Sequence, residues 1–234
     1  ARRREHRRRG DGGQRRRVID VFHAPRDCTC SDVDTRDVAL SDGDTVMLRF
    51  PRLDASTVRA LADSVRRHRE ETLARYSTDR IVNAIAQAVE LWTDPSYSER
   101  RLAEHLIPAI TGYDASMVRI ELKRYMRMFR RRELLRFVDD ELDCPQMLDE
   151  YRPNRSGGYT RLYGPELSLL VFSSNVPGIP VWSMTMGLLT KSAILGKSSF
   201  DEPLMPVLFA RSLASVDPDM AAALGIVPWR RGNL

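Results

Sequence analysis

The stretch that decides the fold class is LSLLVFSSNVPGIPVWSMTMGLLTKSAILGKSS, residues 167–199. It opens with a continuous apolar run over 167–172, which is typical of a central parallel strand covered by helices on both faces. Residues 182–190 are rich in Met and Leu and predict a helix, and residues 193–195 predict a second short strand. A strand, a helix and a parallel strand in this order form a right-handed βαβ unit, so the sequence predicts an α/β fold.

The turn after the first of these strands is not a glycine-rich nucleotide loop, because it reads SSNVPG over 173–178. Ligands of parallel sheets bind beyond the carboxyl ends of the strands, so we expect the loops at 173–178 and 196–199 to face one crevice. The side-chain amide of Asn175 offers two N–H donors that could hold a carbonyl oxygen as it gains negative charge. Lys197 could reach the sugar or phosphate of a nucleotide. The alternative is that Asn175 is an ordinary turn residue and that Lys197 is solvated.

Two short strands are predicted ahead of this unit, in VIDVFHAP at 18–25 and in TVMLRFP at 45–51. An Asp-rich loop joins them, and its turn signal is SDGD at 41–44. We expect the two strands to form a small sheet or an edge hairpin.

Apolar residues recur at three- and four-residue spacing between residues 54 and 142, which predicts a series of helices with one buried face each. Ser96 and Glu99 match a capping box, so we expect a helix to begin there and to end near Thr111. A longer helix is expected after Asp114. Residues 150–166 hold Pro, Gly, Asn and Ser in quick succession and predict a loop between the helical region and the βαβ unit.

Positive charge is unevenly distributed along the chain, whose formal net charge is +5 at pH 7. Residues 1–17 hold nine arginines against two acidic residues, so the remainder is slightly acidic. We expect a disordered Arg-rich tail on this basis, and specific nucleic-acid binding ranks last among the function classes. A second basic cluster, over 123–132, is either a solvated helix face or a site for an anionic partner such as a cofactor phosphate or a coenzyme tail.

The three cysteines, Cys28, Cys30 and Cys144, fit a reducing compartment and predict neither a disulfide framework nor a zinc site. No apolar run reaches the roughly 18 residues that a membrane span needs, and no apolar segment follows the N-terminal arginines as in a secretory signal. The sequence therefore predicts a cytoplasmic protein without a metal centre.

Three motifs of the C-terminal part carry a family resemblance: SSNVPGIP after the first strand, AILGKSSFDEP at and after the second, and LFARSLASVDPDMAAALGIVPW as the next helix and strand. Together they resemble the aldehyde dehydrogenase superfamily, and more closely its acyl-CoA reductase branch, which includes the fatty-acid reductase of bacterial luminescence. The preceding helices, with LWTDPSYSERR and GYDASMV, are also similar to that branch. The resemblance implies an aldehyde-dehydrogenase-like α/β fold, in which an N-terminal helical region precedes an incomplete Rossmann-type parallel sheet.

The resemblance also implies roles for individual residues. Asn175 matches the Asn of an Asn-x-Pro turn that helps to form the oxyanion hole, and Lys197 matches the Lys that contacts the adenosine ribose. Many NAD-preferring members have a Glu three residues after that Lys, but the position is Phe200 here. NADPH is therefore the implied cofactor, because no carboxylate repels a 2′-phosphate. Ser173 and Ser199 are further candidate cofactor contacts.

Members of this family are longer than this chain and carry the nucleophilic Cys and the general-base Glu in a half that has no match here. The resemblance therefore implies an N-terminal portion that lacks the thiol-bearing catalytic domain. Its expected parts are a disordered tail (1–17), short strands and a loop (18–53), a helical region (54–150) and the N-terminal part of an NAD(P)-binding domain (151–234).

The implied activity is the NADPH-dependent reduction of a fatty acyl thioester or activated acyl group to the aldehyde through a thioacyl-enzyme. This chain alone is then expected to be inactive, and the complete enzyme to be a homo-oligomer that receives its substrate from an acyl-activating synthetase. The alternative is a non-catalytic interaction module, or a half-protein that pairs with a separate thiol domain or with such a synthetase. A stable, monodisperse chain would favour the alternative, since a truncated half should self-associate through its unfinished sheet.

Overall fold

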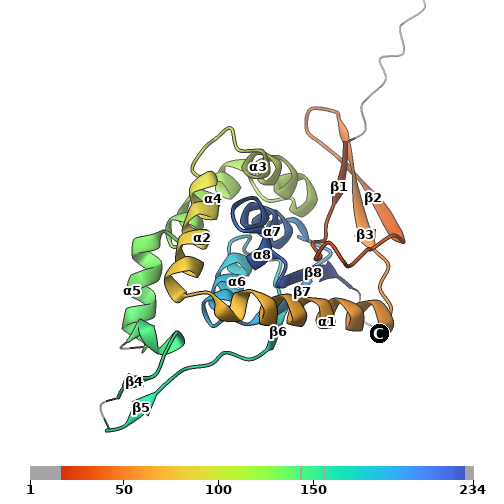
Figure 1. Ribbon diagram of the computed structural model, residues 1–234. Helices are drawn as coiled ribbons and strands as arrows, with labels where there is room; N and C mark the ends of the chain where they lie inside the picture. The colour runs from red at the N-terminus through yellow and green to blue at the C-terminus, as the bar shows by residue number, and fades with distance from the viewer. Residues whose placement is uncertain (1–16, 143, 155, 230–234) are drawn as a thin grey trace, which may run out of the picture.

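The computed structural model describes residues 17–142, 144–154 and 156–229, which form an N-terminal sheet, a helical region and a parallel sheet with helices on both faces (Figure 1). The predicted Arg-rich tail lies outside the described residues, except for Arg17, which begins strand β1 (Arg17–Asp20). Within the described ranges, no helix has both the length and the apolar character that crossing a membrane requires.

The elements of the chain follow one another in three groups. The N-terminal sheet and first helices are β1, β2 (Val33–Ala39), β3 (Thr45–Pro51), α1 (Ala55–Glu71), the short 3-10 helix η1 (Leu73–Arg75) and α2 (Thr78–Leu91). The middle group is α3 (Ser98–Thr111), α4 (Ala115–Arg127), α5 (Arg131–Leu142), the 3-10 helix η2 (Pro145–Leu148), β4 (Arg152–Pro153) and β5 (Tyr159–Thr160). The last group is β6 (Leu167–Val171), α6 (Ile179–Leu189), β7 (Ala193–Ser198), α7 (Leu204–Val216), α8 (Pro218–Ala221) and β8 (Leu224–Pro228).

The N-terminal sheet has the strand order β1-β3-β2. β3 spans the range predicted for it, but the expectation of only two strands was wrong, since β2 lies within the Asp-rich loop and pairs antiparallel with β3. The turn between β2 and β3 is closed by the amide of Leu40, which donates to the carbonyl of Asp44 at 2.8 Å. β1 pairs with β3 in parallel, so β1 and β3 are not a hairpin.

Helix starts in the middle of the chain are fixed by side chains that cap free backbone N–H groups. Asp54 caps α1, Ser77 caps α2 and Asp114 caps α4. The predicted capping box at the start of α3 is wrong: Tyr97 occupies the N-cap position, and the Ser96 hydroxyl bonds to the carboxylate of Asp94 at 2.8 Å. The predicted end of this helix is confirmed, because Gly112 follows Thr111 with a left-handed φ of 76°.

The long helix predicted after Asp114 is two helices, α4 and α5, and the chain between them turns at residues 128–130. This turn brings the fully buried ring of Phe129 to 5.8 Å from the ring of Trp182 on α6. Arg131, from the basic cluster of the sequence, bonds to Asp79 of α2 at 2.5 Å. Part of that cluster therefore holds α5 against α2.

The second sheet is parallel throughout, with the strand order β6-β7-β8. Side chains of β7 alternate between two layers: Leu195 packs with Leu61 and Val65 of α1, whereas Ile194 belongs to the larger core with α6 and α7. α1 thus covers one face, and α6 and α7 cover the other (Figure 1). The strand is also longer than predicted, so Lys197 lies within it and not beyond it.

β6 was predicted to be a central strand covered by helices on both faces, but within the described residues it is not. Among the described strands β7 is central, and β6 lies at the edge of the sheet. Leu169 and Val171 are 59% and 67% exposed, since alternate residues of the apolar run point away from the core.

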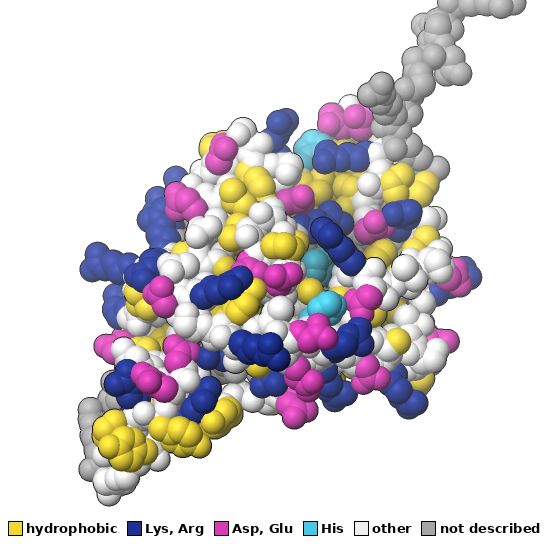
Figure 2. Space-filling view, in the orientation of Figure 1, with side chains coloured by type: hydrophobic (Ala, Val, Ile, Leu, Met, Phe, Trp, Pro, Cys, Tyr) yellow, Lys and Arg dark blue, Asp and Glu magenta, His cyan; other side chains and the backbone are white. Residues whose placement is uncertain are grey.

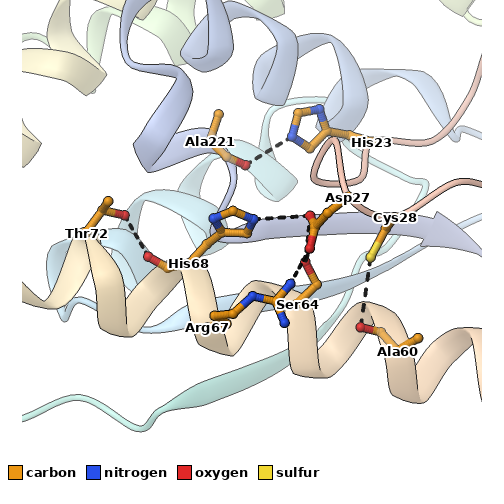
Figure 3. A network of polar contacts seen from close by, with 9 residues as sticks. All are labelled: His23, Asp27, Cys28, Ala60, Ser64, Arg67, His68, Thr72 and Ala221. Carbon is orange, nitrogen blue, oxygen red and sulfur yellow. Dashed lines mark hydrogen bonds and ion pairs between the residues drawn. The ribbon is translucent and has the colours of Figure 1, made fainter.

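The segment after β1 ties the N-terminal sheet to β8. His23 and Ile226 exchange two backbone hydrogen bonds, with N···O distances of 2.8 and 2.7 Å. The imidazole Nε2 of His23 also lies 3.1 Å from the carbonyl oxygen of Ala221 (Figure 3). Burial lowers the pKa of His23, so the ring is held in its neutral form.

Asp27 ties the same segment to α1. Its carboxylate accepts hydrogen bonds from Ser64, Arg67 and His68, which lie on one side of the helix (Figure 3). Desolvation acts to raise the pKa of Asp27, but the bonds from His68 and Ser64 outweigh it, and the pKa is lowered overall. The N-terminal sheet is therefore attached to both α1 and β8.

The predicted loop at 150–166 contains a hairpin, β4–β5, that projects from the rest of the molecule (Figure 1). Three tyrosines on and beside it are strongly exposed: Tyr151, Tyr159 and Tyr163. Figure 2 shows hydrophobic side chains gathered at this projection.

Candidate functional site

The turn after β6 and the helix α4 enclose a cavity of about 430 Å³, called here the Asn175 pocket. The side chain of Asn175 is exposed at its wall. Apolar and aromatic side chains form most of the lining, which consists of Tyr113, Asp114, Met117, Val118, Glu121, Tyr125, Asn175, Val176 and Pro177. The pocket can therefore accept an apolar chain while presenting an amide to a polar group at its wall.

Two tyrosines fix the turn that carries Asn175. The hydroxyl of Tyr113 donates to the backbone carbonyls of Ser174 and Asn175, at 3.3 and 3.2 Å. The ring of Tyr125 packs directly on Gly178, where a Cβ atom would lie 2.1 Å from the ring carbon Cγ. Only glycine allows this contact, so the end of the turn is held against α4.

The other predicted site residues lie at the carboxyl edge of β6 and β7. The amide of Phe172 donates to the carbonyl of Lys197 at 2.9 Å, so the loops after the two strands leave the sheet side by side. Ser173 is exposed in the first loop. In the second, the hydroxyl of Ser199 accepts from the amide of Asp201 at 3.1 Å. The structure thus brings Ser173, Lys197 and Ser199 to one edge of the sheet.

A second cavity, of about 600 Å³, separates this edge from the N-terminal sheet and is called here the Phe200 pocket. Its lining consists of Asp34, Thr35, Arg36, Phe50, Pro51, Arg52, Leu53, Phe200, Pro228 and Trp229. Lys197 lies beside it, with Nζ 5.7 Å from the ring centroid of Trp229. Asn175 and Phe200 therefore line two different cavities.

Sequence reasoning missed the contribution of β2 and β3 to the Phe200 pocket. The pocket residues of these strands precede Phe200 by about 150 positions, and no motif spacing connects the two segments. The register of β2 against β3 places Arg36 opposite Leu48, a pairing that depends on a strand the sequence pattern did not reveal.

Glu202, directly after this site, was also missed. Its side chain is only 2% exposed, and its Oε1 accepts from the amides of Leu204 and Met205 at the start of α7, each at 2.9 Å. Burial raises the pKa of Glu202 to about 7, although the two backbone hydrogen bonds act to lower it. Glu202 stands directly before Pro203, the N-cap residue of α7, and no sequence motif predicted a carboxylate at this helix start.

None of the three cysteines lines either cavity, and all are free thiols. Cys28 faces the carbonyl of Ala60 on α1, and the thiol of Cys144 lies 3.2 Å from the side-chain oxygen of Gln146. Among the residues that the structure describes, no group of three His, Cys, Asp or Glu side chains is placed to hold a metal ion.

Residues 73–233 match the family described as Acyl-CoA reductase (LuxC), and the chain belongs to this family. It is similar to the long-chain acyl-protein thioester reductases of Photorhabdus laumondii subsp. laumondii, with 26% identity over 152 residues, and of Vibrio harveyi, with 24% identity over 154 residues. Each match covers 64% of this chain and 32% of the relative, so the matched part spans about a third of the relatives' length. The resemblance seen in the motifs is confirmed.

Solved structures show the same fold. The NADP-dependent glyceraldehyde-3-phosphate dehydrogenase from Bacillus halodurans C-125, complexed with NADP, is similar with a TM-score of 0.64 and 14% identity, over 88% of this chain and 41% of that chain. The salicylaldehyde dehydrogenase from Pseudomonas putida G7, complexed with salicylaldehyde, has a TM-score of 0.63 and 11% identity, over 93% and 43%. The predicted aldehyde-dehydrogenase-like α/β fold is thereby confirmed.

Proposed function

We propose that the chain is the cofactor-binding and oxyanion-stabilising part of an enzyme that reduces a long-chain acyl thioester to the aldehyde with NADPH. The observation that carries the proposal is the Asn175 pocket, in which an exposed amide lies at the wall of an apolar cavity, in a member of the acyl-CoA reductase family. Residues 151–234 are then the N-terminal part of the NAD(P)-binding domain, and residues 54–150 supply α4 as a wall of the pocket.

Asn175 acts on the carbonyl oxygen of the substrate. In the proposed reaction a thiolate attacks the acyl carbonyl and the original thiol leaves. The new thioester then accepts a hydride and collapses to the aldehyde and the free thiolate. Negative charge develops on the same oxygen in both steps, and the amide N–H groups of Asn175 stabilise it. The hydroxyl of Tyr113 holds the turn, so the donors are in place before the charge forms.

The residues at the carboxyl edge of the sheet fit a nicotinamide cofactor, which supplies the hydride when it is bound. Lys197 would contact the ribose, and Ser173 and Ser199 are the proposed polar contacts beside it. Two observations support this assignment: the Phe200 pocket is flanked by aromatic rings, and a lysine lies beside it. Phe200 itself supports NADPH over NADH, because a hydrophobic ring stands where a carboxylate would repel a 2′-phosphate.

The attacking thiolate and the general base are proposed to come from outside the 234 residues, since Cys28, Cys30 and Cys144 line neither cavity. The three free thiols support a reducing compartment, and we place the reaction in the cytoplasm. A homo-oligomeric complete enzyme and an acyl-activating synthetase as substrate donor complete the proposal.

The test replaces Asn175 in the longest form of the enzyme that cells produce. Asn175→Ala should lower turnover about a hundredfold, because an oxyanion donor is lost. Asn175→Asp, which keeps the shape but removes both N–H donors, should be similarly impaired. Ser174→Ala in the same turn is the matched control and should keep its turnover. An Asn175→Ala enzyme within about twofold of wild type would sink the oxyanion assignment.

The exposed edge strand favours a second candidate, in which this chain pairs with a separate thiol domain or with a synthetase and is not catalytic by itself. Leu169 and Val171 of β6 present apolar side chains at an unpaired strand edge of the described sheet. Light scattering separates the two candidates: a stable monomer that binds a thiol-bearing protein favours the second, and self-association of the chain favours the first.

A further inference from the structure

We propose that Arg36, on strand β2, selects NADPH over NADH by binding its 2′-phosphate, and that the Phe200 pocket holds the adenosine end of the cofactor. This inference rests on the proposed function and names a specificity-determining residue for it. β2 and β3 form one wall of the pocket, and both lie outside residues 73–233, which match the family.

The register of the N-terminal sheet places Arg36 on the face that looks into the molecule. Arg36 lies opposite Leu48, and Asp34 lies opposite Phe50, so each pair projects from the same face of the sheet. Leu48 and Phe50 are buried, whereas Arg36 is exposed. Arg36 therefore lies on the face of the sheet that carries the buried side chains, but its guanidinium stays accessible because it lines the Phe200 pocket.

Arg36 is held directly beside the residue that replaces the family's carboxylate. Its Nη1 donates to the backbone carbonyl of Phe200 at 3.2 Å, and its guanidinium carbon lies 5.3 Å from the ring centroid of Phe50. The rings of Phe50 and Phe200 stack at 5.1 Å with an interplanar angle of 9°. The guanidinium is therefore oriented by the carbonyl of Phe200 and by the ring of Phe50, which itself stacks on Phe200.

A guanidinium suits a phosphate better than any other side chain, because its five N–H donors form a planar fork that matches two phosphate oxygens. Arg36 can therefore bind a phosphate and still donate to the carbonyl of Phe200. The 2′-phosphate is the group that distinguishes NADPH from NADH, so a contact at this point determines the choice of cofactor.

The remaining walls suit an adenosine phosphate. The volume of about 600 Å³ is in the usual range for a small-molecule pocket, and the ring of Trp229 offers a flat surface on which a base can stack. Lys197 beside this ring adds a second cation. Asp34 also lines the pocket, but its carboxylate is paired with Arg52 at 2.6 Å, which offsets its repulsion of a phosphate.

The wall that carries Arg36 is fixed relative to the parallel sheet. His23 pairs with Ile226 of β8, and Arg211 of α7 donates to the carbonyl of Asp20 at 2.6 Å. The distance between β2 and the carboxyl edge of the sheet is thus set before any ligand binds, which keeps the ordering cost of binding low.

The test is calorimetric titration of the full chain with NADP+, NAD+ and adenosine 2′,5′-bisphosphate. Wild type should bind NADP+ more tightly than NAD+. Arg36→Met should weaken the binding of NADP+ and of the bisphosphate about 10- to 100-fold, the usual effect of losing a charged hydrogen bond, and should leave NAD+ binding within about twofold. The affinity of Arg36→Lys for NADP+ should lie between that of wild type and that of Arg36→Met. Arg66→Met is the matched control, since Arg66 is an exposed arginine of α1 that bonds to Asp63, and it should change nothing.

Retained NAD+ binding also shows that the variant is folded. Equal loss of both nucleotides in Arg36→Met, or an unchanged preference for NADP+, would overturn the role of Arg36 and leave the proposed function intact. A wild-type chain that binds none of the three compounds would overturn both.

Discussion

Replacing Glu202 with Gln should stabilise the protein at neutral and alkaline pH. The carboxyl group is 2% exposed, and within the described residues its Oε2 has no hydrogen-bond partner. Burial raises its pKa from 4.5 to about 7, so the folded protein holds this proton more tightly than the unfolded chain does. The unfolding free energy then falls as the pH rises above 4.5, the pKa of this carboxyl group in the unfolded chain. The fall is complete above about pH 7, the pKa in the folded protein.

The size of the effect follows from the shift. Each pKa unit corresponds to about 1.4 kcal/mol, so ionisation of Glu202 costs the folded state about 3 kcal/mol at alkaline pH. Gln cannot ionise and can still accept the amides of Leu204 and Met205 through its carbonyl oxygen. Between about pH 5 and about pH 8, wild type should therefore lose about 2 to 3 kcal/mol of unfolding free energy relative to Glu202→Gln.

Urea denaturation at several pH values measures this difference directly. The contributions of the other titrating groups to the unfolding free energy cancel when wild type and Glu202→Gln are compared at each pH. The neighbouring exposed carboxylate gives the control: Asp201→Asn should follow the wild-type pH profile. Parallel profiles for wild type and Glu202→Gln would refute the reasoning, since they would mean that Glu202 ionises in the folded state at no cost.

Three further predictions follow from single contacts. Relative to His23→Gln, wild type should lose unfolding free energy as the pH falls below 6.5, because burial lowers the pKa of His23 in the folded state, and thermal melts of the two proteins at each pH measure this difference. Gly178→Ala should lower the unfolding free energy by about 1 to 3 kcal/mol, since its Cβ meets Tyr125, and an unchanged urea midpoint would contradict that packing. Tyr113→Phe removes the hydroxyl that holds the Asn175 turn, and should lower turnover of the complete enzyme about 2- to 10-fold in a steady-state assay.

The βαβ unit was predictable because its apolar runs have strand and helix lengths and its polar loops fall at the strand ends. Helix limits were predictable where a capping side chain is present, as at Asp114, and failed at Ser96, whose hydroxyl bonds to Asp94 instead. β2 was not predictable, since its sequence VDTRDVA is mostly polar and exposed and forms a strand through its pairing with β3.

The position of β6 in the sheet and the lining of the Phe200 pocket could be seen only in the tertiary structure. A continuous apolar run shows that a strand has apolar side chains, but not that both of its neighbours are present, so the exposure of Leu169 and Val171 was missed. Asn175 and Lys197 were predicted to be site residues from their positions after the strands and from the family resemblance. Arg36 had no such support, because it reaches Phe200 only when the N-terminal sheet packs beside β8.

The central claim is the reduction of an acyl thioester by the complete enzyme. Its most direct test is to purify the protein as expressed from its native locus, supply a long-chain acyl thioester and NADPH, and measure both aldehyde formation and NADPH oxidation. The account predicts one aldehyde for each NADPH consumed, and an about hundredfold fall in the rate of both signals in Asn175→Ala. Absence of aldehyde with NADPH and with NADH, from the longest form of the protein that cells produce, would contradict it.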